Sequence, residues 1–171
     1  MIETNRLTLR QYLLNDYQPY LAMCTDAVVV RFLGGRPFSP EDAWHRLMRY
    51  AGHWSLLGHG IFAVFEKCSG NYVGETGIAD FHRGLGASFD GVGEGSWTFS
   101  SRVHGFGYAF EATDAAHRWY TDTLRQSRTV CLIHPENSAS LKLASRLGYT
   151  AFGEQNYKDQ PMIMLERQAR L

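Results

Sequence analysis

The stretch from Trp97 to Ala112 constrains the fold of this chain more than any other part. It reads as the end of a strand that begins near Glu94, a turn with two glycines, Gly105 and Gly107, and the start of a helix. Glycine has no Cβ, so the backbone can approach a ligand closely there. The first amides of a helix lack partners and lie at the positive end of its dipole, where phosphate binds readily. The stretch therefore predicts a strand, a phosphate-binding turn and a helix.

Before this stretch the sequence predicts two helices and three strands. Arg6–Arg10 alternates polar and apolar residues, which is typical of a half-buried strand. Asn15 is expected to cap a short helix. Ser39 and Pro40 start a second helix, which ends at Gly58. Two more strands are predicted, over Ile61–Phe65 and Tyr72–Ala79.

After Ala79 the pattern changes. Residues His82 to Gly95 are rich in glycine and poor in aliphatic residues, which predicts a mobile connection. The helix after Gly107 is expected to reach about Leu124. The apolar run Thr129–Ile133 is typical of a strand covered on both faces. A last helix is predicted between Asn137 and Gly148, followed by two closing strands over Tyr149–Glu154 and Pro161–Glu166.

The predicted order of elements is β-α-α-β-β-β-α-β-α-β-β, which indicates an α+β domain. About four helices would lie on a mixed, mostly antiparallel sheet. The central strand-helix-strand unit would supply one parallel pair with a right-handed crossover. With 171 residues and 44% hydrophobic content, residues 1–171 are expected to form a single domain with its own core.

Charge and cysteine content exclude several classes of partner. Lys and Arg together number 17, as do Asp and Glu, so no net field favours nucleic acid or an anionic membrane. The three cysteines are far apart and the seven histidines show no metal-ligand spacing, so we expect no disulfide framework and no metal. The sequence shows no signal peptide and no apolar run of membrane-spanning length. We therefore expect a cytoplasmic protein.

Taken alone, the spacing Arg102-x-x-Gly105-x-Gly107 is weak evidence, because two glycines can also serve only a turn and close packing. A Rossmann turn is disfavoured, since Phe110 replaces the third glycine and no βαβ repeat precedes it. A Walker A loop is excluded, because no Gly-Lys-Ser/Thr follows.

The same segment resembles the R/Q-x-x-G-x-G/A pyrophosphate loop of the GNAT superfamily of N-acetyltransferases. His104–Ala112 is similar to the W-G-x-G-Y-A-T-E-A run of its ribosomal-protein-alanine acetyltransferase-like branch, with His104 in place of the usual aromatic residue. Thr4–Arg10 resembles the T-x-R-L-x-L-R opening of that branch. His134–Ser140, followed by Leu147-Gly148-Tyr149, resembles its P-x-N-x-A-S and L-G-F/Y segments. These ordered matches span nearly the whole chain.

The resemblance implies that acetyl-CoA is the co-substrate, bound in a cleft where two central strands splay apart. Its pantetheine would pair along Trp97, Thr98 and Phe99 like an added strand. Asn137 would reach the cofactor from the last helix, and its alternative role, compatible with the first, is that of a helix cap. Arg102 would add a charge-assisted contact to the pyrophosphate, and the alternative is a solvated arginine at the end of a strand. The remaining pyrophosphate contacts would come from the loop and the helix start, at His104, Gly105, Phe106, Gly107, Tyr108 and Ala109.

The resemblance also implies candidates for proton transfer. Attack on the thioester needs an unprotonated amine, so a base is useful. Glu94 matches the acidic position of the family's E-x-G-Y-W-L run and is the first candidate base, with Glu75 and Asp80 as rivals. Ser140 matches the serine of N-x-A-S and would serve the leaving sulfur, with Tyr149 as a second candidate. The structural alternatives are a solvated strand-end glutamate and a serine in the first turn of a helix.

Together these features predict an acetyl-CoA-dependent N-acetyltransferase that acts by direct transfer in a ternary complex. The acceptor would be a primary amine, either a protein N-terminus or a small molecule, and the sequence does not separate the two. The alternative is a non-catalytic module that senses acyl-CoA. A homodimer is left open. The segment from His82 to Gly95 would lie near the acceptor entrance, either as a lid or as a disordered turn.

Overall fold

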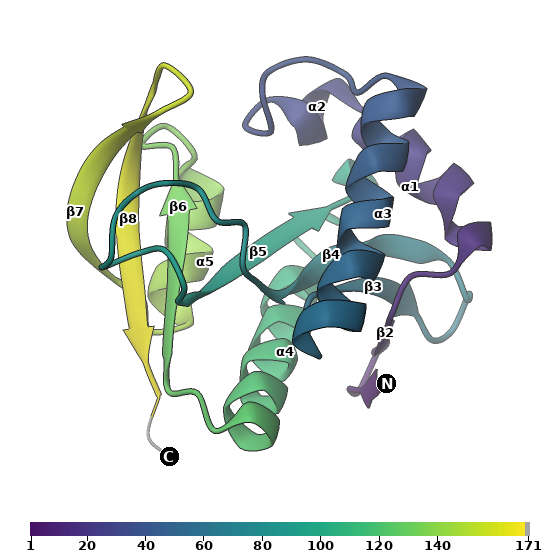
Figure 1. Ribbon diagram of the computed structural model, residues 1–171. Coiled ribbons are helices and arrows are strands. Elements are labelled where there is room, and N and C mark those ends of the chain that lie inside the picture. The colour runs from purple at the N-terminus through teal and green to yellow at the C-terminus, as the bar shows by residue number, and fades with distance from the viewer. Residues whose placement is uncertain (170–171) are drawn as a thin grey trace.

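A mixed sheet of eight strands organises residues 1–169, which are the residues that the computed structural model describes (Figure 1). The strand order is β1-β2-β3-β4-β5-β6-β8-β7, and β5 and β6 form the one parallel pair. The strands are β1 (Ile2–Glu3), β2 (Leu7–Arg10), β3 (Ile61–Glu66), β4 (Tyr72–Ala79), β5 (Gly93–Phe99), β6 (Arg128–Ile133), β7 (Thr150–Tyr157) and β8 (Gln160–Gln168).

Five helices pack on this sheet within the same residues. They are α1 (Tyr17–Cys24), α2 (Ala27–Val30), α3 (Pro40–Leu57), α4 (Tyr108–Leu124) and α5 (Ser138–Arg146). Two short 3₁₀ turns, Leu14–Asp16 and Ser101–Val103, precede α1 and α4. The predicted α+β class, with its single parallel pair, is confirmed.

The two halves of the sheet separate between β5 and β6. These strands pair at only two positions, Gly93 with Thr129 and Glu94 with Val130. Beyond them β5 stays on β4 as far as Phe99, whereas β6 stays on β8. Figure 1 shows the two strands diverging. The predicted splay is confirmed. Within residues 1–169, the edge of β5 that faces β6 has no strand partner after Glu94.

Helices cover both faces of the sheet. Ala112 and Tyr120 of α4 pack against one face of β2 to β5, whereas Tyr20 of α1 and Leu47 of α3 pack against the other. Ala144 of α5 covers the β6–β8–β7 half in a third cluster. Each half of the splayed sheet therefore has apolar support from helices, and Trp97 of β5 packs against both the α4 cluster and the α5 cluster.

Local capping signals fixed several helix ends as predicted. The Ser39 hydroxyl accepts the amide of Asp42 at 3.0 Å, and the Asp42 carboxylate returns to Ser39, which forms a capping box at the start of α3. Gly58 after α3 has a φ of +71°, and Gly148 after α5 has a φ of +88°. Both values lie in the left-handed region that ends helices at glycine.

Two short elements differ from the prediction. Asn15 does not cap a helix, because it lies inside the 3₁₀ turn and the Asp16 carboxylate binds the turn instead. That carboxylate accepts the amide of Leu13 at 2.7 Å and the guanidinium of Arg10 at 2.6 Å. Helix α2 was not predicted, since its three valines have low helix propensity. Asp26 caps it, since the carboxylate of this residue accepts the amide of Val28 at 2.9 Å.

The connection between β4 and β5, residues 80–92, crosses in front of the diverging halves of the sheet (Figure 1). The prediction of a mobile segment reaching Gly95 needs correction, because β5 already begins at Gly93 and the connection is tied at several points. The Asp90 carboxylate accepts the amides of Gly84 and Gly86 at 3.0 and 2.8 Å. Arg128 of β6 donates to the Ser88 carbonyl at 2.8 Å.

Candidate active site

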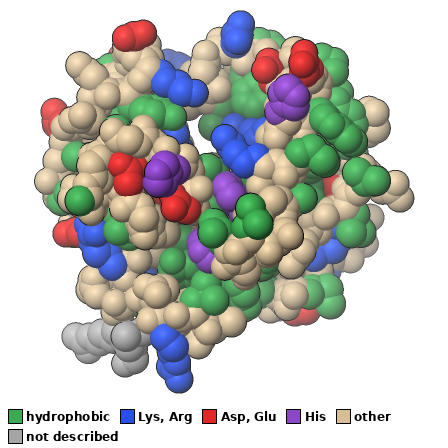
Figure 2. Space-filling view, in the orientation of Figure 1, with side chains coloured by type: hydrophobic (Ala, Val, Ile, Leu, Met, Phe, Trp, Pro, Cys, Tyr) green, Lys and Arg blue, Asp and Glu red, His purple; other side chains and the backbone are tan. Residues whose placement is uncertain are grey.

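A cleft of about 570 Å³ opens where β5 and β6 separate. Figure 2 shows a hollow between the two halves of the molecule, with basic side chains in it. The walls of the cleft come from α2, the end of β5, the loop before α4, the first turn of α4, and α5. Ten predicted site residues line it: Trp97, Thr98, Phe99, His104, Gly105, Gly107, Tyr108, Ala109, Asn137 and Ser140.

Gly105 and Gly107 shape the loop at the start of α4. Their φ angles are +84° and +79°, in the left-handed region that side chains other than glycine rarely adopt. A Cβ built on Gly105 would meet no protein atom within 4 Å. Because Gly105 also lines the cleft, the space beside it is available to a ligand.

Only part of this loop offers free amides. The amides of His104 and Phe106 donate to the carbonyls of Ser101 and Val103, at 3.2 and 3.3 Å. The amides of Gly105, Gly107, Tyr108 and Ala109 make no hydrogen bond within residues 1–169, whereas the Glu111 amide donates to the Gly107 carbonyl at 3.2 Å. The predicted set of phosphate-binding amides is therefore narrowed to those of Gly105, Gly107, Tyr108 and Ala109.

The N-terminal motif supports this loop from outside the cleft. The Arg6 guanidinium donates to the Phe106 carbonyl at 2.9 Å and to the Glu111 carboxylate at 2.7 Å. The Thr4 hydroxyl also donates to Glu111, at 2.7 Å. Glu111 lies in the first turn of α4. The T-x-R opening and the glutamate that follows the glycines therefore form one structural unit.

Helix α5 brings Asn137 and Ser140 to the opposite wall. The Asn137 side chain accepts the amide of Ser140 at 3.1 Å, which confirms its role as the cap of α5. The Ser140 hydroxyl accepts the indole N–H of Trp97 at 3.2 Å. This contact places a hydroxyl group in the cleft beside β5.

The lining of the cleft suits an anion that also forms hydrogen bonds. Arg31, Lys142 and Arg146 line it together with no carboxylate, and Arg146 stacks 4.1 Å from the centre of the Phe110 ring. The Thr98 hydroxyl is buried and has no hydrogen-bond partner within residues 1–169. A buried hydroxyl without a partner costs about 1–3 kcal/mol, so a ligand that bonds to it gains affinity.

Arg102 and Phe106 do not line the cleft. The Arg102 guanidinium donates to the carbonyl of Tyr72 at the start of β4. The Phe106 ring is exposed, and the backbone carbonyl of this residue accepts from Arg6. A phosphate contact from Arg102 stays a prediction and requires that side chain to leave the Tyr72 carbonyl.

Glu94 occupies the last paired position before the strands separate. Its cross-strand partner Ala79 belongs to the core under α1 and α3, so Glu94 faces that side of the sheet. Its side chain is 6% exposed and binds Arg83 through two contacts of 2.7 Å. Burial raises the pKa of the Glu94 carboxyl, although Arg83 opposes that shift. Glu94 therefore lies at the apex of the splay and outside the cleft lining.

The rival base Glu75 is enclosed by hydrogen bonds. Its carboxylate accepts from Tyr12 at 2.8 Å, from Tyr50 at 2.9 Å and from Arg46 at 3.2 Å, and the residue is 1% exposed. These contacts join α3 to β4, which is a structural role. The other rival, Asp80, accepts the amide of His82 at 2.8 Å.

The second proton-donor candidate, Tyr149, belongs to a buried polar cluster. Its hydroxyl lies 2.7 Å from His117 Nε2 and 2.9 Å from the Thr129 hydroxyl. His117 Nδ1 lies 2.7 Å from the Thr113 carbonyl, so in the neutral ring Nδ1 carries the proton and Nε2 accepts from Tyr149. The hydroxyl of Tyr149 is therefore already hydrogen-bonded to buried side chains, whereas Ser140 lines the cleft.

The same cluster predicts a pH-dependent stability. Burial lowers the pKa of His117 to about 4. An unfolded chain binds a proton at histidine with a pKa near 6.5, so the free energy of unfolding should fall as the pH drops from about 6.5 to 4. The full loss is about 3 kcal/mol.

Urea unfolding of His117→Gln over this pH range measures the effect, because glutamine can accept from Tyr149 but does not titrate. The variant should lose less stability than the wild type as the pH falls. His82→Gln, at a residue whose side chain is 86% exposed, is the control and should keep the wild-type slope. Equal slopes for His117→Gln and the wild type would contradict the prediction.

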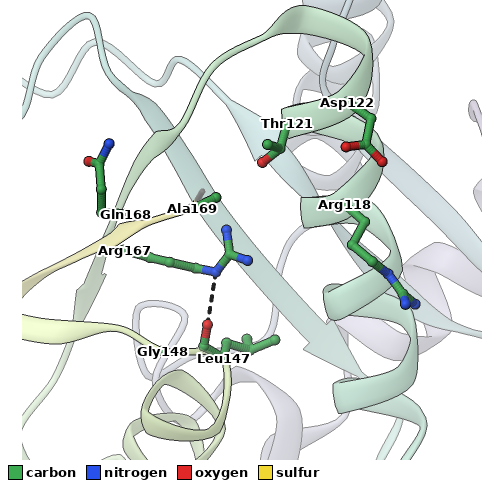
Figure 3. A pocket seen from close by; sticks show the side chains of 8 residues that line it. All are labelled: Arg118, Thr121, Asp122, Leu147, Gly148, Arg167, Gln168 and Ala169. Atoms are coloured by element: carbon green, nitrogen blue, oxygen red, sulfur yellow. Dashed lines mark hydrogen bonds between the residues drawn. The ribbon is translucent and has the colours of Figure 1, made fainter. Parts of the chain in front are cut away.

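A second cavity, of about 320 Å³, has a different set of lining residues (Figure 3). It is lined by the C-terminal half of α4, the turn at Leu147 and Gly148, and the end of β8. Arg167 donates to the Leu147 carbonyl across it at 2.8 Å. None of the predicted site residues lines this cavity, so the cleft beside β5 is the candidate active site.

Comparison with known proteins identifies the family. Residues 6–150 match the acetyltransferase (GNAT) domain family, which covers most of the chain. The chain belongs to the GNAT acetyltransferases. The resemblance found in the sequence is thereby confirmed, and the family identifies the chain as an acyltransferase.

Individual relatives agree with this GNAT assignment. The uncharacterized N-acetyltransferase YnaD of Bacillus subtilis is 23% identical in an alignment of 159 residues that covers 86% of this chain and 81% of that protein. A GNAT-family acetyltransferase from Bordetella pertussis has 30% identity and a TM-score of 0.87, with 97% of this chain and 98% of that chain covered. Spermidine N-acetyltransferase from Vibrio cholerae, solved with CoA and spermine, has 17% identity and a TM-score of 0.75, with 96% of each chain covered. That last likeness shows the fold alone.

Within residues 1–169 the GNAT chain has no helix long and apolar enough to cross a bilayer. The same residues contain no group of three or more His, Cys, Asp and Glu side chains arranged to hold a metal ion.

Proposed function

We propose that this GNAT acetyltransferase moves the acetyl group of acetyl-CoA to a primary amine by direct transfer in a ternary complex. The observation that carries the proposal is the composition of the cleft between β5 and β6. It combines an open strand edge, four free amides at a helix start, and a cationic lining without carboxylates. The spermidine N-acetyltransferase that shares this fold was solved with CoA, which supports the choice of co-substrate.

Each part of the cleft would hold a different part of acetyl-CoA. The amides of Gly105, Gly107, Tyr108 and Ala109 would bind the pyrophosphate at the positive end of α4. The open edge of β5 would pair with the amide groups of the pantetheine arm, as an added strand pairs with a sheet edge. Once bound, the co-substrate supplies an activated acetyl thioester.

The residues at the two ends of this arrangement would then move protons. Glu94, directly or through a water molecule, would take the proton that the amine loses as the new C–N bond forms. A backbone amide on the open edge of β5 would stabilise the developing oxyanion. The Ser140 hydroxyl would donate to the sulfur as the C–S bond breaks. No residue carries the acetyl group, since the amine attacks the thioester directly.

The acceptor would approach from the face of the sheet that carries Glu94. We keep both acceptor classes, a protein N-terminus and a small-molecule amine, within the proposal. An α-amine has a pKa near ~8 and an alkyl amine near ~10, so the alkyl amine depends more on a base at neutral pH.

One observation favours the alternative function, a non-catalytic sensor of acyl-CoA. Both carboxylate oxygens of Glu94 are already paired with Arg83. Incubation with acetyl-CoA and a broad panel of amines separates the two functions. Tight binding of CoA with no acetylated product would support the sensor, and an acetylated amine would support the transferase.

The cationic lining of the cleft predicts how the Kd for acetyl-CoA should change when a lining charge is reversed. Lys142→Glu should raise the Kd for acetyl-CoA by roughly 3- to 10-fold at low salt, because an exposed charge in the cleft is reversed next to an anionic ligand. The difference should shrink as salt is added. Calorimetric titration measures it. Lys158→Glu changes the net charge equally outside the cleft and should leave the Kd unchanged; an equal loss for both variants would contradict a specific role for Lys142.

A further inference from the structure

The connection between β4 and β5 reaches both halves of the sheet through one side chain, that of Arg83. Its guanidinium lies 4.9 Å from the centre of the Phe81 ring, which follows β4. It lies the same distance from the ring of Tyr157, the last residue of β7. Arg83 is therefore held between the two halves of the sheet, directly beside Glu94.

Arg83 binds Glu94 in a forked geometry. Nε donates to Oε2 and Nη2 donates to Oε1, both at 2.7 Å. The two side chains are 22% and 6% exposed, so most of the water around the pair is excluded. A paired guanidinium fixes the direction of a carboxylate and favours its ionised form. One lone pair on each oxygen remains free to accept another hydrogen bond.

We propose that Arg83 is the positioning residue for Glu94, holding its carboxylate ionised and oriented at the point where β5 and β6 separate. The inference rests on the proposed function, in which Glu94 is the base. A carboxyl group this deeply buried would otherwise favour its neutral form, which takes no proton. The β4–β5 connection would thus act through Arg83 as part of the catalytic machinery.

Other charged groups near Glu94 do not replace Arg83. Arg49 of α3 favours the ionised carboxylate from a distance, and Asp80 after β4 opposes it. On the β6 side, Cys131 and Tyr149 are neutral, because burial raises the pKa of each. Within residues 1–169, Arg83 is the one residue whose side chain forms a hydrogen bond with Glu94.

Arg83→Gln tests the proposal with two readouts on the full chain. The first is the titration of the Glu94 carboxyl, followed by NMR on ¹³C-labelled glutamate and assigned with Glu94→Gln. The second is the acidic limb of the pH profile of kcat/KM. The midpoint of the Glu94 titration and the midpoint of the acidic limb should both rise by at least about one pH unit in Arg83→Gln. At a pH below both midpoints, this rise corresponds to a loss of about 10-fold in kcat/KM relative to the wild type. Arg83→Lys keeps the positive charge but cannot donate to both carboxylate oxygens in the same forked geometry, so it should raise the two midpoints less. The Kd for acetyl-CoA should not change.

Arg128→Gln is the matched control. It removes the hydrogen bonds that Arg128 donates to the Ser88 carbonyl in the β4–β5 connection and to the Glu166 carboxylate on β8. Arg128 contacts neither Glu94 nor the cleft. Its carboxyl titration should match the wild type. An unshifted Glu94 titration in a folded Arg83→Gln protein would overturn the proposal. A wild-type protein that acetylates no amine would overturn the proposed function instead, and the carboxyl titration tells the two failures apart because it needs no turnover.

Discussion

Glu94→Gln should lower kcat at neutral pH by about 10²-fold, the lower end of what general base catalysis contributes. Glutamine keeps the size of the side chain and can still accept from Arg83, but it cannot take a proton from the amine. Glu94 lies outside the cleft lining, so the Kd for acetyl-CoA should stay within about two-fold. Steady-state kinetics with a responsive amine, together with calorimetry for the Kd, measure both quantities.

The pH profile separates a lost base from a general loss of structure. Burial raises the pKa of Glu94, and activity in the wild type should fall as the pH drops through that pKa, because the protonated carboxyl is no base. Glu94→Gln should lack this acidic limb. Glu154→Gln, at an exposed glutamate on β7, should keep both the limb and the rate. An acidic limb that survives in Glu94→Gln would show that another group is the base.

Gly105→Val should raise the Kd for acetyl-CoA by at least about 10-fold. The new side chain would occupy space that no protein atom fills within 4 Å of the Cβ position and that the pyrophosphate is proposed to use. Valine also disfavours the φ of +84° at this position, so the neighbouring amides would turn away from the ligand.

Gly70→Val separates these two effects from a simple loss of stability. Gly70 has a φ of +70° and also has no atom within 4 Å of its Cβ position, but it lies in the turn between β3 and β4. Both variants should lose similar thermal stability, and only Gly105→Val should lose affinity in a calorimetric titration. Unchanged affinity in Gly105→Val would mean that the turn does not hold the pyrophosphate.

The sequence predicted the backbone structure around the cleft well, because its signals are local. Gly107 and Tyr108 mark the start of α4, and Asn137 caps α5, within a few residues of the groups they organise. The strand-helix-strand order also predicted one parallel pair of strands, which the structure has at Gly93 and Glu94 of β5. Such features depend on backbone conformation and helix ends, which neighbouring residues determine.

The sequence did not predict which polar side chains already have a hydrogen-bond partner within the protein. Tyr149 meets His117 across 32 positions, and Arg6 meets Glu111 across 105. Arg83 is only 11 residues from Glu94, yet their contact depends on how the connection folds back on the sheet. Side-chain contacts of this kind follow from tertiary packing. Arg6 and Glu111 each lie in a recognised motif, but neither motif by itself names the other residue as its partner.

The most direct test of acetyl transfer in the cleft is mass spectrometry of the products formed from acetyl-CoA. The wild-type chain is incubated with a library of small-molecule amines and N-terminal peptides, with Gly105→Val run in parallel. We predict that the wild type forms an acetylated amine and free CoA in equal amounts, and that Gly105→Val forms far less of both at the same subsaturating co-substrate concentration. The account would be contradicted if the wild type acetylated no amine, or if Gly105→Val acetylated as fast as the wild type.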